Sequence, residues 1–250
     1  MTDDSDVVPA RDDRIIAHAV LAGLASAIPI PLLDDAVKDR VQRRMVADLA
    51  ERRGVALTPE EVALLADDKS AFVAGAIKSL ALWPLKKALQ KTFLVLGARR
   101  VVALASECYQ RGLLLDHAFS AGACAPDSRH SPTDLRKAVD DVLEQVRGGP
   151  IERALVAGLG ESRQLVSEGL ELLLSRVRAW RGRPSDAMAD RAAEELTREG
   201  EPGVAAIADR LRRAMADVGG EHFEDLFRRL DERLERGPEE ASERAGDEHR

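Results

Sequence analysis

The spacing of apolar and polar residues predicts helices along almost the whole chain. An apolar run without charged side chains extends from Ile15 to Leu33, and residues 11–28 are expected to form a first helix. After it, apolar residues recur at every fourth position, which places them on one face of a second helix. This stripe consists of Val37, Val41, Met45 and Leu49. Gly54 is then expected to end the second helix.

Helix start and stop signals divide this region further. Pro29 and Pro31 are expected to end the first helix, because proline lacks an amide proton and disfavours a helical predecessor. Asp34 stands where the second helix needs an N-cap. The sequence Thr58-Pro59-Glu60-Glu61 combines a cap, a first-turn proline and a glutamate at the third position. It therefore predicts a short helix over residues 59–65.

A second long apolar region covers residues 70–119, with a kink or break expected at Trp83-Pro84. The following segment, 120–131, has the composition of a linker.

Gly158 and Gly160 are interpreted as a helix break, because no strand precedes them and a dinucleotide-binding loop needs one. The later helices are expected near residues 132–147, 150–159, 161–181, 185–199, 203–218 and 220–236, the last with Phe223, Leu226, Phe227, Leu230 and Leu234 on one face.

Composition supports an all-α fold, a multi-helix bundle of helical hairpins in two helical subdomains. Alanine, leucine, arginine and glutamate dominate, and aromatic residues make up 3% of the 250 residues. These residues favour helices, and the alternation that strands require is missing. The expected organisation is a disordered leader (1–10), an apolar and basic helical domain (11–119), a linker (120–131), a C-terminal helical domain (132–236) and a disordered tail (237–250).

Charge is distributed unevenly, although the net charge is −7. Residues 69–118 carry eight basic side chains against two acidic ones, and the C-terminal third is acidic. A basic, apolar segment suits anionic lipid headgroups or an acidic partner. Nucleic acid is not expected as a partner, because the chain has neither a basic domain nor a recognition motif. The residues predicted to contact lipid are Trp83, Lys86, Lys87, Lys91, Arg99 and Arg100.

No pattern of reactive side chains predicts an enzyme, a cofactor or a metal site. Cys108 with His117, or Cys124 with His130, would be the candidate nucleophile–base pairs, but nothing in the sequence marks either thiol as activated. His18 is interpreted as a core histidine with a satisfied ring. The acidic pairs Asp34-Asp35 and Asp67-Asp68 could hold a cation or a basic partner, although helix capping explains Asp34 better. The two cysteines and the acidic N-terminus favour a cytoplasmic location.

One pattern resembles a known bacterial family. Pro29-x-Pro31-x-x-Asp34, followed by Gln42-x-x-Met45 and Gly54, is similar to the YcjF-like helical domain that accompanies Era-like GTPases. EcsC-like membrane-associated proteins share a similar hairpin, and the resemblance covers residues 15–119. It implies a membrane location beside a GTPase. This chain has no phosphate-binding loop of its own, so nucleotide chemistry would belong to a partner.

Three functions remain open from the sequence. The first is a non-enzymatic helical protein, peripheral on the cytoplasmic membrane and acting with a GTPase partner. The second is a soluble interaction module that docks through the proline corner at 27–54. The third is an enzyme whose site the sequence does not reveal. The sequence also leaves open whether residues 15–33 insert into a membrane or are buried in protein.

Overall fold

A computed structural model describes residues 12–26, 33–67, 89–161 and 202–236. Within these ranges the chain forms eight helices that pack against each other and no strands, which confirms the all-α prediction. The helices are α1 (Asp13–Ala25), α2 (Leu33–Arg53), α3 (Pro59–Leu65), α5 (Leu89–Ser120), α6 (Pro132–Gln145), α7 (Pro150–Glu161), α10 (Pro202–Ala216) and α11 (Gly220–Arg236). The predicted leader, the corner at Pro29 and Pro31, the break at Pro84, the helices over 162–199 and the tail lie outside the described residues.

The predicted signals at the end of α2 and the start of α3 are confirmed. Gly54 has a positive φ of 69°, and the amide of the next residue, Val55, donates to the carbonyl of Ala50 at 2.8 Å. This arrangement satisfies carbonyls that the last turn of a helix leaves without partners. Thr58 and Glu61 form a reciprocal capping box, with Pro59 in the first turn. The bounds of α3 are those that the sequence predicts.

The prediction that Asp34 caps α2 is wrong. The helix begins at Leu33, so Asp34 lies in its first turn. A favourable cap contributes only about 1 kcal/mol, which is too little to fix the first residue of a 21-residue helix that packs along its length. An acidic residue in the first turn still interacts favourably with the positive end of the helix dipole.

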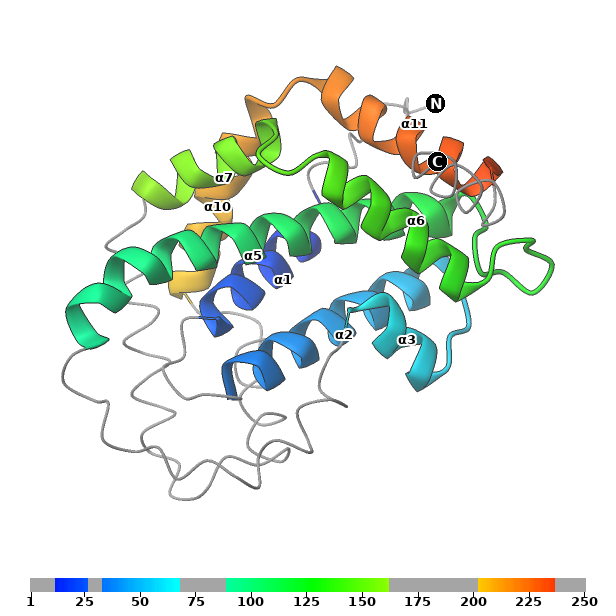
Figure 1. Ribbon diagram of the computed structural model, residues 1–250, viewed down its shortest axis with the longest axis horizontal. Coiled ribbons are helices and arrows are strands. Elements are labelled where there is room, and N and C mark those ends of the chain that lie inside the picture. The colour runs from blue at the N-terminus through cyan, green and yellow to red at the C-terminus, as the bar shows by residue number, and fades with distance from the viewer. Residues whose placement is uncertain (1–11, 27–32, 68–88, 162–201, 237–250) are drawn as a thin grey trace, which may run out of the picture.

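The long helix α5 lies at the centre of the bundle and contacts α1, α2, α6, α7 and α11 (Figure 1). Within residues 100–120, the part of α5 whose side chains are described, the buried residues extend from Val101 to Phe119. The predicted stripe on α2 is confirmed, since Val37, Val41, Met45 and Leu49 are all buried where α2 packs against α1 and α5. The described part of the 15–33 apolar run, residues 15–26, is also buried by protein, apart from the partly exposed Ala17 and His18.

Two glycines allow α1 and α2 to approach α5 closely. A Cβ atom on Gly23 of α1 would lie 2.8 Å from the backbone oxygen of Val101 and 3.1 Å from the Cβ of Ala105. A Cβ on Gly112 of α5 would lie 2.7 Å from Ile15 Cγ2. Contacts this short do not occur between real side chains, so both crossings require glycine.

The prediction that Gly158 and Gly160 break a helix is wrong, because α7 continues through both to Glu161. Gly158 serves the packing of α7 against α10 instead. A Cβ added there would lie 3.1 Å from Ala214 Cβ and 3.2 Å from Leu211 Cδ2. The glycine lowers helix propensity by about 1 kcal/mol, and close packing with α10 offsets that cost.

One hydrophobic core includes helices from both sides of the 120–131 segment. It contains Leu113 and Phe119 of α5, Leu135 of α6 and Leu155 of α7. The predicted face of α11 also packs on it, with Phe223, Leu226 and Leu230 buried and Phe227 and Leu234 partly buried. The division into two subdomains stays a prediction.

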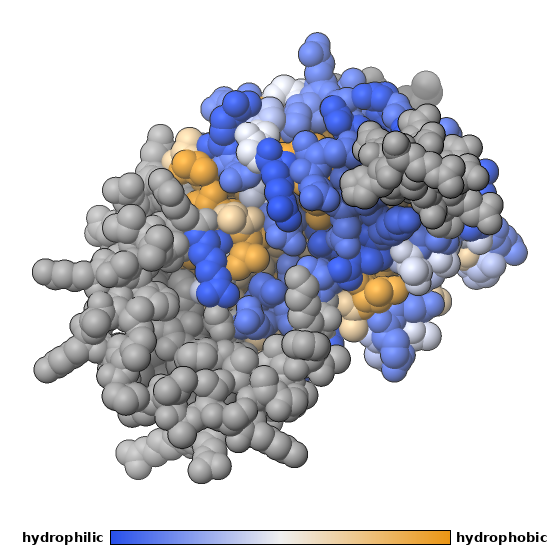
Figure 2. All heavy atoms as spheres, in the orientation of Figure 1, coloured by the Kyte–Doolittle hydropathy of each residue, from blue (hydrophilic) through white to orange (hydrophobic). Residues whose placement is uncertain are grey.

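The view in Figure 2 shows a mainly hydrophilic face, with apolar residues in small separate groups. Among the described residues, Val156 on α7 is the one large apolar side chain that is exposed. The core is therefore well covered by the polar faces of the helices in these ranges.

We expect Gly23→Ala to lower the free energy of unfolding by about 1–3 kcal/mol, because the new methyl group meets a backbone oxygen that cannot rotate away. Gly219→Ala is the matched control, since no atom lies within 4 Å of a Cβ at that position. Denaturant unfolding monitored by circular dichroism measures both. Equal stability of the two variants would contradict the close α1–α5 contact.

Candidate functional site

The residues that carry the family resemblance lie mostly in the core. Met45 is buried against Gly112 and Cys108, with its sulfur 3.8 Å from the Cys108 thiol. Gln42 is also buried and lies beside the same thiol. Gly54 shapes the end of α2. Pro29 and Pro31 lie outside the described residues, and the side chain of Asp34 is not described. Gln42 and Met45 therefore stabilise the fold and offer no surface to a partner.

The predicted lipid-contacting residues fall around the start of α5. Trp83, Lys86 and Lys87 precede the helix and lie outside the described residues. Lys91 and Arg99 belong to the α5 backbone. Arg100 is the one member of the set whose side chain the structure describes, and its guanidinium pairs with Asp35 in the first turn of α2 at 3.4 Å. These two side chains are 49% and 43% exposed.

The cysteines and histidines do not form the nucleophile–base pairs considered from the sequence. Cys108 is fully buried, and burial raises the pKa of its thiol to about 12. His117 instead stacks on Phe227 with the ring centres 4.5 Å apart and contacts Asp231 through Nε2 at 3.0 Å. Burial also raises the pKa of Cys124 to about 11. Thiols with raised pKa values are poor nucleophiles at neutral pH.

His18 is mostly buried between α1 and α2, and one of its ring nitrogens makes a hydrogen bond. Nδ1 lies 2.8 Å from the carbonyl oxygen of Arg14, so this nitrogen carries the proton and donates. Nε2 faces the Asp48 carboxylate at 3.7 Å across the α1–α2 contact. Burial lowers the pKa of His18, and its effect exceeds the opposing effects of the Arg14 carbonyl and Asp48. In this neutral form Nε2 carries a lone pair and cannot donate to Asp48, so the hydrogen bond that His18 makes is the one to Arg14 within α1.

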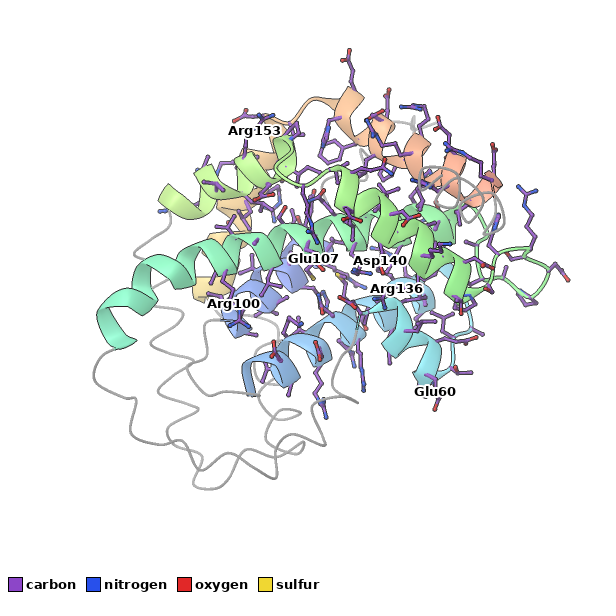
Figure 3. The ribbon with its side chains drawn as sticks, viewed as in Figure 1. Glu60, Arg100, Glu107, Arg136, Asp140 and Arg153 are labelled. Atoms are coloured by element: carbon purple, nitrogen blue, oxygen red, sulfur yellow. The ribbon has the colours of Figure 1, made fainter. Side chains whose placement is uncertain are left out.

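A charge network that the sequence did not predict joins α3, α5 and α6. Arg111 of α5 is 3% exposed and donates to Asp140 of α6 at 2.8 Å. Arg136 of α6 binds the same carboxylate and also Asp67, and it donates to the carbonyl of Leu64 at the end of α3. Figure 3 shows Arg136 and Asp140 on α6 close to Glu107 of α5. The network satisfies helix-end carbonyls and fixes α3 against its neighbours.

A second network ties the end of α2 to α1 and α5. Arg52 and Arg53 both donate to Asp116, at 2.8 Å and 2.6 Å, and Arg52 also binds Asp12, the N-cap of α1. Burial alone would raise the pKa of Asp116, but the hydrogen bonds from the two arginines outweigh it, so this pKa lies below its ordinary value. Arg52 and Arg53 are separated from Asp116 by 64 and 63 residues in the sequence, so the sequence alone could not predict these ion pairs.

A cleft of about 430 Å³ lies between the start of α7, the end of α10 and the start of α11. Small side chains leave this space open, among them Ala154, Ala157 and Ala214. Charged groups of both signs line it: Arg153, labelled in Figure 3, together with Asp217 and Glu221. Mixed charge of this kind selects neither an anionic nor a cationic ligand.

Comparison with known proteins adds no family or fold relative. No protein-family model matches the chain, and no curated protein or solved structure shows significant similarity to it. Within the described ranges, no helix has an apolar stretch long enough to span a membrane. No group of three or more histidine, cysteine or acidic side chains in those ranges is arranged to hold a metal ion.

We expect acidification to destabilise the fold through His18. Its pKa in the folded protein lies below the ordinary 6.5, so the unfolded chain binds more protons between the two values. The stabilisation is complete above about pH 6.5 and is lost as the pH falls through the folded value. Unfolding measured at pH 8 and pH 5 should show a smaller loss in His18→Gln than in the wild type. An equal loss would show that His18 is not kept neutral by burial.

We expect Cys108 to be protected from thiol reagents. In the variant Cys124→Ser, the remaining thiol is buried and has a raised pKa, so it should react only as fast as the protein opens. The matched variant Cys108→Ser keeps the partly exposed Cys124 and should react faster. Absorbance with a disulfide reagent, with and without denaturant, measures both rates. Rapid reaction of Cys108 in the native protein would point to an activated thiol.

Proposed function

We propose that this protein is a non-enzymatic helical protein that binds an anionic membrane surface peripherally, at the end of the bundle where α5 begins. The observation that carries the proposal is the course of α5. It is a single helix of 32 residues, and its part from Val101 to Phe119 packs in the core. In Figure 1 its first turns extend past the ends of α1 and α2.

The sequence of these first turns suits a lipid interface. Residues 89–100 include the apolar run Phe93-Leu94-Val95-Leu96 together with three basic residues, Lys91, Arg99 and Arg100. Lys86 and Lys87 precede them. Long basic side chains can keep their stems on apolar surface while their charges reach headgroup phosphates. Each basic residue near an anionic surface contributes about 1 kcal/mol of binding free energy.

The described reactive side chains support a role without catalysis. Cys108, His18 and His117 contribute to packing and to contacts between helices, and the two thiols have raised pKa values. In this function the bundle holds the basic, apolar first turns of α5 at the membrane surface. A GTPase partner, implied by the family resemblance, would act at the same membrane.

The triple variant Lys86→Glu, Lys87→Glu and Lys91→Glu tests this function. We expect the wild-type protein to sediment with vesicles that contain anionic lipid, and to bind more weakly as salt rises, because exposed charges are screened over about 8–10 Å at physiological ionic strength. The triple variant should bind at least about tenfold more weakly, since attraction by three lysines becomes repulsion.

The matched control is Arg129→Glu, Lys137→Glu and Arg147→Glu, which changes the net charge equally at exposed positions on the segment 121–131, on α6 and beyond its end. It should keep vesicle binding close to that of the wild type. If the wild-type protein stays in the supernatant with anionic vesicles at low salt, the membrane function is wrong, and docking of a protein partner becomes the better explanation.

A further inference from the structure

The outer face of α7 carries an exposed apolar side chain beside the cleft of about 430 Å³. Val156 is 52% exposed, and within the described ranges it is the one large apolar side chain that is exposed. The next residue, Ala157, lines the cleft together with Ala154 and Ala214. This face therefore presents an apolar projection and, next to it, a hollow with small apolar side chains in its walls.

The charged side chains at the cleft are divided between its two walls. Arg153 belongs to α7 and precedes Val156 by three residues, so both lie on the same side of that helix. Asp217 and Glu221 belong to the other wall, where α10 ends and α11 begins. All three charged side chains are exposed, and Figure 3 shows Arg153 at the outer edge of the molecule.

These charges have no counter-ion in the part of the chain that the structure describes. None of the three side chains forms an ion pair with a described residue. The arginines on α11 differ in this respect, since Arg228 and Arg229 both pair with Asp225 of their own helix. The basic wall and the acidic wall of the cleft are therefore both available to a partner.

A face with these features is complementary to itself. In a dimer with a twofold axis, every contact from residue i to residue j is matched by the contact from j to i. An axis that runs between Val156 and the cleft places Val156 of each copy over the cleft of the other. The same axis brings Arg153 of each copy to the acidic wall of the other. A ligand of one charge would match one wall only, whereas a second copy matches both.

We propose that this face binds a second copy of the same chain, so that the protein forms a symmetric dimer in which Val156 of each copy enters the cleft of the other. An apolar centre with a polar, charged rim is the usual arrangement of specific protein interfaces. In Figure 1 the start of α7 lies apart from the start of α5, so the dimer and the membrane contact are tested separately.

Sedimentation equilibrium of the full chain over a range of concentrations tests the dimer. One chain has a mass of 27.2 kDa, and the dimer has twice this mass. We expect the wild type to form the dimer reversibly. Val156→Glu should dimerise at least about tenfold more weakly, because its carboxylate would have to enter an apolar cleft. Since Val156 is exposed, circular dichroism should show that this variant is folded like the wild type.

Charge reversal tests how the two walls pair. Arg153→Glu, and the double variant Asp217→Arg with Glu221→Arg, should each dimerise at least about tenfold more weakly, because like charges then face each other. An equal mixture of these two proteins should form a heterodimer, since both contacts again join opposite charges. Lys137→Glu is the matched control, because it makes the same change of charge at an exposed position on α6 and should dimerise like the wild type.

Three results would overturn the proposal. The first is a wild-type protein that stays monomeric at every concentration that sedimentation can measure. The second is a dimer that Val156→Glu leaves unchanged, because the interface would then lie elsewhere. The third is a pair of folded charge-reversal variants that are both weakened and do not associate with each other when mixed. Vesicle binding remains the separate test of the membrane function.

Discussion

The contact between α1 and α5 is the constraint on which the other helix positions depend. At Gly23 the two helices approach until the position of a missing Cβ lies 2.8 Å from a backbone oxygen of α5. At Gly112 the same helix α5 receives Ile15 of α1 and Met45 of α2. A closely packed interior transmits any change of spacing to its neighbours. Because α10 contacts α1 and α7 contacts α5, a wider α1–α5 crossing would also disturb the more distant helices.

Polar contacts fix the elements that the apolar core holds least firmly. The seven-residue helix α3 buries few side chains, and its bounds depend on a capping box at one end and on arginine donors at the other. Arg111 is almost fully buried, and a charge in that position is stable only with good partners. Its hydrogen bond to Asp140 joins α6 to α5. Arg111 also contacts Glu107 of its own helix at 3.7 Å and the Leu65 carbonyl at 3.5 Å, so the charge is shared among groups from α3, α5 and α6.

Local signals in the sequence predict much of this fold, and long-range polar contacts remain beyond them. The stripe from Val37 to Leu49, the bounds of α3 and the apolar face of α11 all follow from spacing or capping, so they could be predicted. The role of Gly158 could not be predicted, because a glycine that lowers helix propensity also permits close packing, and one sequence does not show the neighbouring helix. The partners of Arg111 and Asp116 could not be predicted either, since they depend on how separate helices meet.

The family-like pattern in α2 lies mainly on the buried side of the helix. Gln42 and Met45 face the core, so this pattern describes how α2 packs, and the exposed chemistry of the helix starts at its other end with Asp35. A peripheral membrane protein needs several weak charge contacts at once, each of about 1 kcal/mol. These contacts add together only when one rigid element presents them on the same side. A helix that packs in the core from Val101 to Phe119 meets this requirement.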